Sequence, residues 1–247
     1  MNASVDPDSP QGRGTAAAVL PAGEPGSGRG SLDRRRILGA AVTLIDEHGL
    51  RYLTMRRLGS YLGVEGMALY HYIPGREALL DGVVETVIDE LYGDPDVHLT
   101  DPDWRDYLRR LSHGVRRIAL AHPEVFPLIA TRPPAAPWVR PPLRSLRWME
   151  SFLGTLRDHG FSDADSVATY RAFSSFLLGH LLLEVSAQGA DIGPIEQEDP
   201  GQAEPADLSN YPLLSQLEAE LSENHSAAEF DEALDSLVER VGRLLHK

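Results

Sequence analysis

The chain has 247 residues, of which 42% are apolar and 24% are charged, a balance typical of globular proteins rather than of fibrous or unstructured chains. It contains no cysteine, which excludes disulfides, iron–sulfur clusters and zinc-thiolate sites. The 37 acidic and 23 basic residues leave a formal net charge of −14, which excludes a uniformly positive surface.

The first 30 residues predict a disordered tail, because few large apolar side chains are present to offset the entropy lost on ordering. The segment lacks a basic start followed by an apolar block, so no signal peptide is expected. The longest apolar run, residues 172–183, is twelve residues long, whereas about 20 are needed to cross a bilayer. We therefore expect a cytoplasmic protein that does not enter a membrane.

Helical periodicity begins at Ser31, the expected N-cap of a first helix that ends at His48 and Gly49. Two short helices joined by a tight turn follow. Thr54 opens the first, Gly63 closes it, and the second extends from Gly66 to Tyr72. Gly63 suits the sharp turn because glycine tolerates positive φ.

This spacing is that of a helix-turn-helix, whose second helix enters a DNA major groove, although an ordinary pair of antiparallel helices has the same spacing. Four apolar residues are expected to hold the two helices together: Leu58, Leu62, Val64 and Leu69.

The remainder predicts helix after helix, without the period-two alternation of strands, and hence an all-α fold. An acidic stretch rich in Pro and Gly, Gly189 to Asn210, is expected to be a mobile loop. The predicted helices cover Glu77–Leu91, Trp104–Ile118, Glu124–Ala130, Leu143–Leu156, a segment from Ser162 or Asp163 to about Ser186, and a final apolar stripe from Phe230 to Leu245.

Positive charge gathers in one part of the chain. Between Asp191 and Glu239 there are fourteen acidic residues and no Lys or Arg, whereas Ser31 to Arg76 contains seven Arg against four acidic residues. A basic segment on an acidic protein is typical of a nucleic-acid-binding head, although chance clustering on solvated helices gives the same asymmetry.

The paired helices carry a more specific signal. The run Leu53–Val64 (LTMRRLGSYLGV), followed by Ala68–Tyr72 (ALYHY) and by Arg76–Asp81 (REALLD), resembles the DNA-binding segment of TetR-family transcriptional repressors. Two later segments, Ala130–Pro133 and Leu178–His180, resemble the regulatory domain of the tetracycline-repressor branch.

The resemblance implies a three-helix DNA-binding head with the helix-turn-helix, residues 31–77, and a larger helical domain for ligand binding and dimerisation, residues 78–247. The last two long helices of that domain would pack with a second subunit as a four-helix bundle. The stripe of residues 230–245 and the apolar run of residues 172–183 both fit this role, although each is also compatible with a helix buried inside its own monomer.

The resemblance also assigns DNA contacts to eleven positions. Gly66, Met67 and Ala68 at the tip of the recognition helix offer almost no hydrogen-bonding groups, so methyl contacts to thymine and DNA shape would carry more of the specificity. The expected DNA-contacting residues are Thr54, Arg56, Arg57, Glu65, Gly66, Met67, Ala68, Tyr70, His71, Tyr72 and Arg76.

A pocket for a small organic ligand is expected in the larger domain, lined mostly by apolar groups. His180 and Trp148 are equally compatible with core packing, and Glu184 lies one residue beyond the acidic pocket residue of the tetracycline branch. The expected ligand-binding residues are Tyr92, Thr131, Arg132, Trp148, Phe176, His180 and Glu184.

One departure from the branch concerns metal binding. Tetracycline repressors place a metal-binding histidine three residues before the threonine of this motif, where this chain has Leu128. Leucine has no donor atom for magnesium, so a metal–tetracycline complex is not expected as the inducer. No metal and no other cofactor is expected. The pocket is expected to take a larger or more apolar molecule than a metal–tetracycline complex.

These observations predict a homodimeric repressor that binds a palindromic operator and is released by a small organic inducer. An enzyme is not expected, because the chain has no Gly-rich phosphate loop, no metalloprotease spacing and no nucleophile motif. A helical scaffold for protein partners, or an activator without a small-molecule response, remains an alternative.

Overall fold

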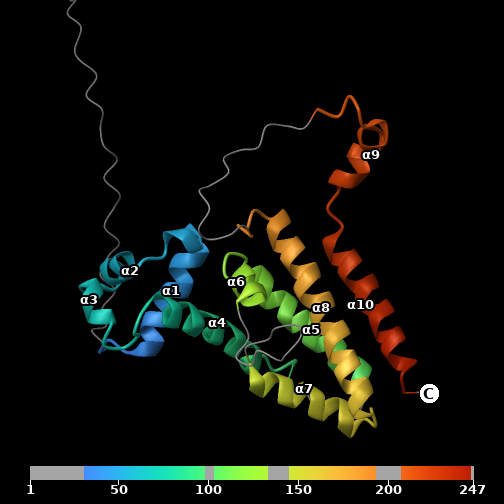
Figure 1. The fold of residues 1–247 in the computed structure, drawn as a ribbon, viewed down its shortest axis with the longest axis horizontal. Helices are drawn as coiled ribbons and strands as arrows, with labels where there is room; N and C mark the ends of the chain where they lie inside the picture. Colours follow the sequence, from blue (N-terminus) through green and yellow to red (C-terminus); the bar gives the residue numbers. More distant parts are fainter. Residues whose placement is uncertain (1–30, 98–102, 133–144, 193–206, 246–247) are drawn as a thin grey trace, which may run out of the picture. The chain divides into compact units, whose positions relative to one another are not determined.

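The computed structural model describes residues 31–97, 103–132, 145–192 and 207–245, so the predicted tail lies outside the described residues. Over these ranges the fold is all-helical, as predicted, with ten α-helices, a short 3-10 helix (η1, Leu50–Tyr52) and no strand (Figure 1). The α-helices are α1 Arg34–His48, α2 Met55–Leu62, α3 Gly66–Leu69, α4 Arg76–Gly93, α5 Trp104–Ala121, α6 Phe126–Thr131, α7 Leu146–Asp158, α8 Asp163–Ala187, α9 Pro212–Ser222 and α10 Ser226–Gly242.

The first helix begins after Asp33 and not after the predicted Ser31. The carboxylate of Asp33 accepts a hydrogen bond from the backbone N–H of Arg36 at 2.7 Å, which satisfies one of the donors left free at a helix start. Ser31 lies two residues too early to do so. The helix ends before Gly49, as its periodicity predicted, and buries Ile37, Leu38, Ala41, Val42, Leu44 and Ile45.

The next two helices form the predicted helix-turn-helix. Thr54 caps α2 by accepting the backbone N–H of Arg57 at 3.2 Å, and Gly63 adopts the left-handed φ of +72° that the sharp turn requires. The second helix is a single turn that ends at Leu69 rather than at Tyr72, because the chain leaves helical geometry for a turn there.

Two glycines allow the backbones of α2 and α3 to touch. A Cβ on Gly59 would lie 2.7 Å from the backbone nitrogen of Gly66, and a Cβ on Gly66 would lie 3.0 Å from the carbonyl oxygen of Met55. Any side chain at either position would force the two helices apart. Leu58 and Leu69 are fully buried beneath this contact.

The fourth helix, α4, packs against α1 on one side and against α5 and α6 on the other (Figure 1). Its contact with α1 is close, because a Cβ on Gly82 would lie 2.5 Å from a methyl carbon of Leu38. Both ends extend beyond the predicted Glu77–Leu91 by one or two residues. The same helix therefore contacts α1, which precedes the helix-turn-helix, as well as α5 and α6.

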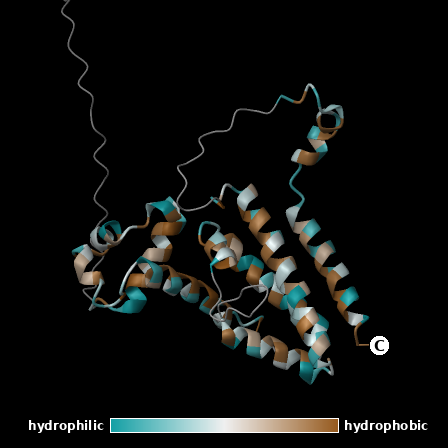
Figure 2. Ribbon diagram, in the orientation of Figure 1, coloured by the Kyte–Doolittle hydropathy of each residue, from teal (hydrophilic) through white to brown (hydrophobic). Residues whose placement is uncertain are grey.

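The regulatory helices are arranged around α8, which packs on α5, α6, α7 and α10. Ser162, one of the two predicted caps, accepts the backbone N–H of Asp165 at 3.1 Å. Phe152 of α7 and Phe173 of α8 are fully buried, with ring centroids 5.2 Å apart. Figure 2 shows hydrophobic stretches along α4, α8 and α10.

Some helix boundaries differ from the predicted ones. α7 is capped by Ser145, and the predicted start at Leu143 lies outside the described residues. The last helix ends at Gly242, three residues before the predicted Leu245.

The structure also contains a helix that was not predicted, α9. None of its residues is buried, and its four leucines are 44–70% exposed: Leu213, Leu214, Leu217 and Leu221. It begins two residues after the predicted mobile loop, of which residues 193–206 lie outside the described residues. The helix was missed because its short leucine repeat directly follows a segment that is acidic and rich in proline.

Candidate DNA interface and ligand cavity

The tip of α3 presents three of the expected DNA-contacting residues to solvent. Met67 is 72% exposed, Glu65 is exposed and Ala68 is partly exposed. Gly66 differs, because the position where a side chain would stand is filled by the backbone of α2, 3.0 Å from the oxygen of Met55. Gly66 therefore serves the packing of the two helices and has only its backbone to offer to DNA.

The three expected arginines are used in different ways. The side chain of Arg56 is exposed, and its guanidinium makes no hydrogen bond or ion pair with another described residue. The guanidinium of Arg57 lies 4.0 Å from the ring centre of Tyr52 and donates to the carbonyl of that residue at 3.1 Å. Arg76 donates to the carbonyl of Leu53 at 2.7 Å. Arg56 thus has its whole charge available, whereas the other two also brace the head.

The other expected contacts surround the tip. Tyr70 and Tyr72 are 45% and 42% exposed, and His71 between them is exposed as well. Thr54, Tyr70 and Arg76 line one hollow on the head, which brings hydroxyl groups and a guanidinium together. Groups of this kind are the usual partners of phosphate oxygens. A polar and basic surface therefore surrounds an apolar tip.

Arg132, an expected ligand contact, is engaged by α4 in the described structure. Its side chain is only 11% exposed and lies against α4, with Nε 2.8 Å from Asp81 Oδ1 and Nη2 2.8 Å from Glu77 Oε2. A guanidinium can bond two carboxylates at once because its N–H groups point in fixed directions. Arg132 therefore ties the end of α6 to the first turns of α4.

His122, to which the sequence assigned no role, lies where three helices meet. It follows the end of α5, with Nδ1 2.7 Å from Asp46 Oδ2 of α1 and Nε2 3.2 Å from Glu90 Oε2 of α4. The hydrogen bond to Asp46 raises the pKa of His122, and this effect outweighs the burial that lowers it. Since both ring nitrogens face carboxylates, the imidazolium form fits this position best.

A second charged contact joins the head to the regulatory helices. Arg51 of η1 lies 2.6 Å from Asp191, just beyond the end of α8. Burial raises the pKa of Glu124 nearby, and the negative charges of Asp191 and Asp46 act in the same direction. Ionic groups thus add to the apolar packing of α1 on α4 between the head and the helices behind it.

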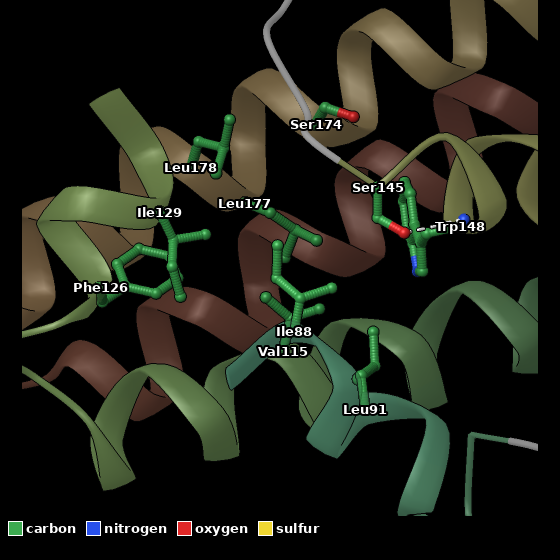
Figure 3. A pocket seen from close by; sticks show the side chains of 10 residues that line it. All are labelled: Ile88, Leu91, Val115, Phe126, Ile129, Ser145, Trp148, Ser174, Leu177 and Leu178. Carbon is green, nitrogen blue, oxygen red and sulfur yellow. Dashed lines mark hydrogen bonds between the residues drawn. The ribbon is translucent and has the colours of Figure 1, made fainter. Parts of the chain in front are cut away.

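A cavity of about 70 Å³ lies between α4 and α8 (Figure 3). Trp148, one of the expected ligand-binding residues, lines it, and no charged side chain does. Two of the lining residues belong to α4. A molecule in the cavity therefore contacts the helix that packs against α1 of the head. The lining residues are Ile88 and Leu91 of α4, Val115 of α5, Phe126 and Ile129 of α6, Ser145 and Trp148 at the start of α7, and Ser174, Leu177 and Leu178 of α8.

Tyr92 and Thr131 adjoin this region without lining the cavity. The hydroxyl of Tyr92 lies 3.4 Å from Ser145 Oγ, so Tyr92 stands behind a lining residue. The hydroxyl of Thr131 donates to the carbonyl of Pro127 at 2.7 Å and is engaged within its own helix.

Three other expected ligand residues lie on the side of α8 that faces α10. The ring centroids of Phe176 and His180 are 5.5 and 5.3 Å from that of Phe230. The carboxylate of Glu184 accepts two hydrogen bonds from Arg116, at 2.6 and 3.0 Å. Burial would raise the pKa of Glu184, but the bonds and the charge of Arg116 hold it below its usual value. Phe176 thus packs against α10, whereas His180 and Glu184 also line a separate open hollow of about 420 Å³ together with residues 221–226.

Leu128, which replaces the metal-binding histidine of the branch, is buried and offers no donor atom. Among the described residues, no group of three or more His, Asp or Glu side chains is placed to hold a metal ion. Nor is any helix in the described part long and apolar enough to span a membrane.

Comparison with known protein families gives two matches. Residues 37–83 match the bacterial regulatory proteins of the tetR family, and residues 98–241 match the tetracyclin repressor-like C-terminal domain. The tetracycline repressor protein class A from transposon 1721 of Escherichia coli is 31% identical over 212 residues, which cover 86% of this chain and 91% of that protein. The first curated relatives are matched over 61–91% of their own lengths.

Solved structures show the same fold. A possible TetR family transcriptional regulator from Streptomyces coelicolor A3(2) superposes with a TM-score of 0.67 at 27% identity, over 86% of this chain and all of that one. The Streptomyces coelicolor protein ActR, in complex with actinorhodin, has a TM-score of 0.62 at 24% identity, over 85% of this chain and 95% of its own. At that identity the likeness to ActR concerns the fold alone.

Proposed function

Because the chain belongs to the TetR family of bacterial regulatory proteins, we propose that it is a homodimeric repressor that binds a palindromic operator and is released by a small organic inducer. The family consists of DNA-binding transcription regulators, so the chain is a regulator and not an enzyme. Within the proposal, residues 31–77 form the DNA-binding domain and residues 78–247 bind the ligand and the second subunit.

The observation that carries the proposal is the position of α4 between the head and the cavity. Gly82 of this helix packs against Leu38 of α1, whereas Ile88 and Leu91 line the cavity. Arg132 additionally ties the start of the helix to α6. A molecule that widens the cavity therefore displaces α4, and α1 to α3 move with it.

The head supplies the DNA contacts. The exposed charge of Arg56 reaches a phosphate or a base edge, and the hydroxyls of Thr54 and Tyr70 bond the DNA backbone. Met67 and Ala68 read thymine methyl groups at the tip of α3. This division of roles is supported by the exposure of these residues and by the hollow that Thr54, Tyr70 and Arg76 share.

A second copy of the chain supplies the second head. One recognition helix of a single turn contacts few bases, and two linked heads bind far more tightly than one. Half-sites one helical turn apart require recognition helices about 34–36 Å apart. Exposed apolar side chains on the helices beyond the cavity support pairing there, among them Leu183 of α8, which is 68% exposed.

Release follows from a change in that separation. An inducer that favours the wrong separation lowers operator affinity without touching DNA, through its different affinity for the two states. A coupling free energy of about 1–3 kcal/mol between the two sites is sufficient for such a switch.

The test is a gel-shift titration of the purified full chain against DNA from upstream of its own coding sequence. We expect a shift that Arg56→Ala weakens and that the control Arg171→Ala, an exposed arginine of α8, leaves unchanged. Light scattering of the same samples should give twice the mass of one chain. A dimer that shifts none of the upstream fragments would instead support the helical scaffold.

A further inference from the structure

The walls that described residues give the cavity carry no charge. Eight of its ten lining side chains are aliphatic or aromatic, and the other two are Ser145 and Ser174. A charged group that leaves water for such a site loses solvation that two hydroxyls cannot replace. The cavity therefore selects against ions.

The charged side chains that the motif suggested for ligand contact are engaged elsewhere. Glu184 is bonded to Arg116 at 2.6 and 3.0 Å. Arg132 is bonded to Asp81 and Glu77, each at 2.8 Å. Neither pair lines the cavity, so the described walls hold no counter-ion for a charged ligand.

The polar groups of the cavity gather at one end. In the view of Figure 3, Phe126 and Ile129 lie at one end, whereas Ser145, Ser174 and Trp148 lie toward the other. The Oγ of Ser145 accepts the backbone N–H of Trp148 at 3.2 Å. Its contact with the Tyr92 hydroxyl, at 3.4 Å, exceeds the usual O–H···O range of about 2.5–3.0 Å. The Ser145 hydroxyl can thus donate a shorter bond to a ligand oxygen.

The size of the cavity restricts the shape of its ligand. Its volume is about 70 Å³, whereas an engineered apolar cavity that takes benzene measures about 150 Å³. A ligand must therefore part the walls. A flat ring system, about 3.5 Å thick at van der Waals contact, requires the smallest separation between α4 and α8.

From these observations we infer that the cavity takes an uncharged molecule with a flat aromatic ring system and one carbonyl or hydroxyl group. The rings lie among Ile88, Leu177 and Phe126, and the oxygen accepts a hydrogen bond from Ser145. The inference rests on the proposed function, since it names the ligand class of the same cavity.

The experiment compares two probes of nearly equal shape by equilibrium dialysis against the full chain without DNA. They are 2-acetylnaphthalene, a neutral ketone, and 2-naphthoate, in which a carboxylate oxygen replaces the methyl group. We expect the ketone to bind at least tenfold more tightly. Equal or tighter binding of the naphthoate, or no measurable binding of the ketone, overturns the inference.

Two variants of α8 assign the binding to the cavity. Leu178→Trp fills the space between the walls and should weaken ketone binding at least tenfold, whereas Ala164→Trp adds the same side chain at an exposed position in the first turn of α8 and should leave it unchanged. If circular dichroism shows that Leu178→Trp has lost helical content, the smaller Leu178→Phe takes its place. Equal ketone affinities of the filled variant and the control overturn the inference.

The gel shift separates this inference from the proposed function. If the chain binds the ketone in the cavity but shifts no operator DNA, the proposed function is contradicted and the inferred ligand class is still supported. A chain whose operator complex is released by the naphthoate and not by the ketone supports the function and contradicts the ligand class.

Discussion

The head is joined to the helices behind it by ionic contacts in addition to the apolar packing of α1 on α4, whereas the regulatory helices share a larger apolar core. At the junction, Arg51 meets Asp191 at 2.6 Å and His122 meets Asp46 at 2.7 Å. In the core, Phe152 is fully buried among other aromatic rings. Ionic contacts weaken with salt and with changes in protonation, and apolar contacts do not. The junction can therefore change while the regulatory helices keep their fold.

The helix α4 takes part in both regions. Ile88 and Leu91 line the cavity, whereas Glu90 between them in sequence faces His122 at the junction. A ligand in the cavity and a proton on His122 would therefore both affect α4, through different residues of the helix. The predictions below separate the two regions, in order of decreasing effect.

The largest effect is expected from a charge placed in the apolar region. Leu237 of α10 is 9% exposed, so Leu237→Glu buries a carboxylate without a partner and costs several kcal/mol. We expect monomers or unfolded protein and no operator binding, as measured by light scattering and circular dichroism. The control Ser236→Glu adds the same charge at an exposed neighbour and should retain the helical content. A folded, dimeric Leu237→Glu protein would contradict the apolar packing of this helix.

The second effect concerns a residue on the surface of the head, outside both the junction and the apolar core. Arg56→Ala removes an exposed charge from the head and should cost about 1–3 kcal/mol of operator binding free energy. The thermal midpoint and the inducer concentration for half-release should stay the same, because no contact at the junction or the cavity is lost. Titration of labelled operator at several salt concentrations measures both the affinity and the salt slope. An unchanged affinity would exclude Arg56 from the DNA interface.

The third effect tests one of the ionic ties. Arg132→Ala removes the guanidinium that bonds Glu77 and Asp81, and both carboxylates retain contact with water, so we expect a loss of about 1 kcal/mol in unfolding free energy. Arg132→Lys should recover only part of this, because an ammonium group lacks the planar fork that bonds two carboxylates. Urea unfolding at low and high salt is the measurement. A loss that is equal at both salt concentrations would indicate packing rather than charge.

The smallest effect is a pH dependence of the junction. Since the folded state raises the pKa of His122, the stabilisation is present in full below the unfolded value of about 6.5 and is lost as the pH rises through the folded value. The difference in thermal midpoint between the wild type and His122→Gln should therefore be largest near pH 6 and shrink above it. A matched control is His71→Gln, because His71 is exposed on the head. A difference that grows with pH would contradict the ionic role of His122.

The head was the part of the molecule that its own sequence described best. Thr54 as a cap and Gly63 as a left-handed turn were confirmed, because caps and turns depend on residues only a few positions apart. Even there, the structure added what local pattern does not contain. Gly66 was expected at the DNA surface, but it faces the backbone of α2.

The ligand region was decided by tertiary packing. Of the seven residues expected to bind a ligand, Trp148 alone lines the cavity, and the other lining residues come from four more helices and from Ser145, the cap of α7. His180 and Glu184 have helical spacing and suitable chemistry, yet they turn toward α10 and Arg116. Whether a residue of α8 lines the cavity or faces α10 depends on which neighbouring helix packs against that side of α8.

Sequence by itself therefore determined the all-helical fold, the helix-turn-helix and the family, since each rests on local periodicity or on a short motif. Tertiary structure decided the walls of the cavity and the ties of the junction. His122 shows why, because its two partners are 76 and 32 residues away in the chain. Contacts over such distances form only when helices pack, and no local spacing of residues records them.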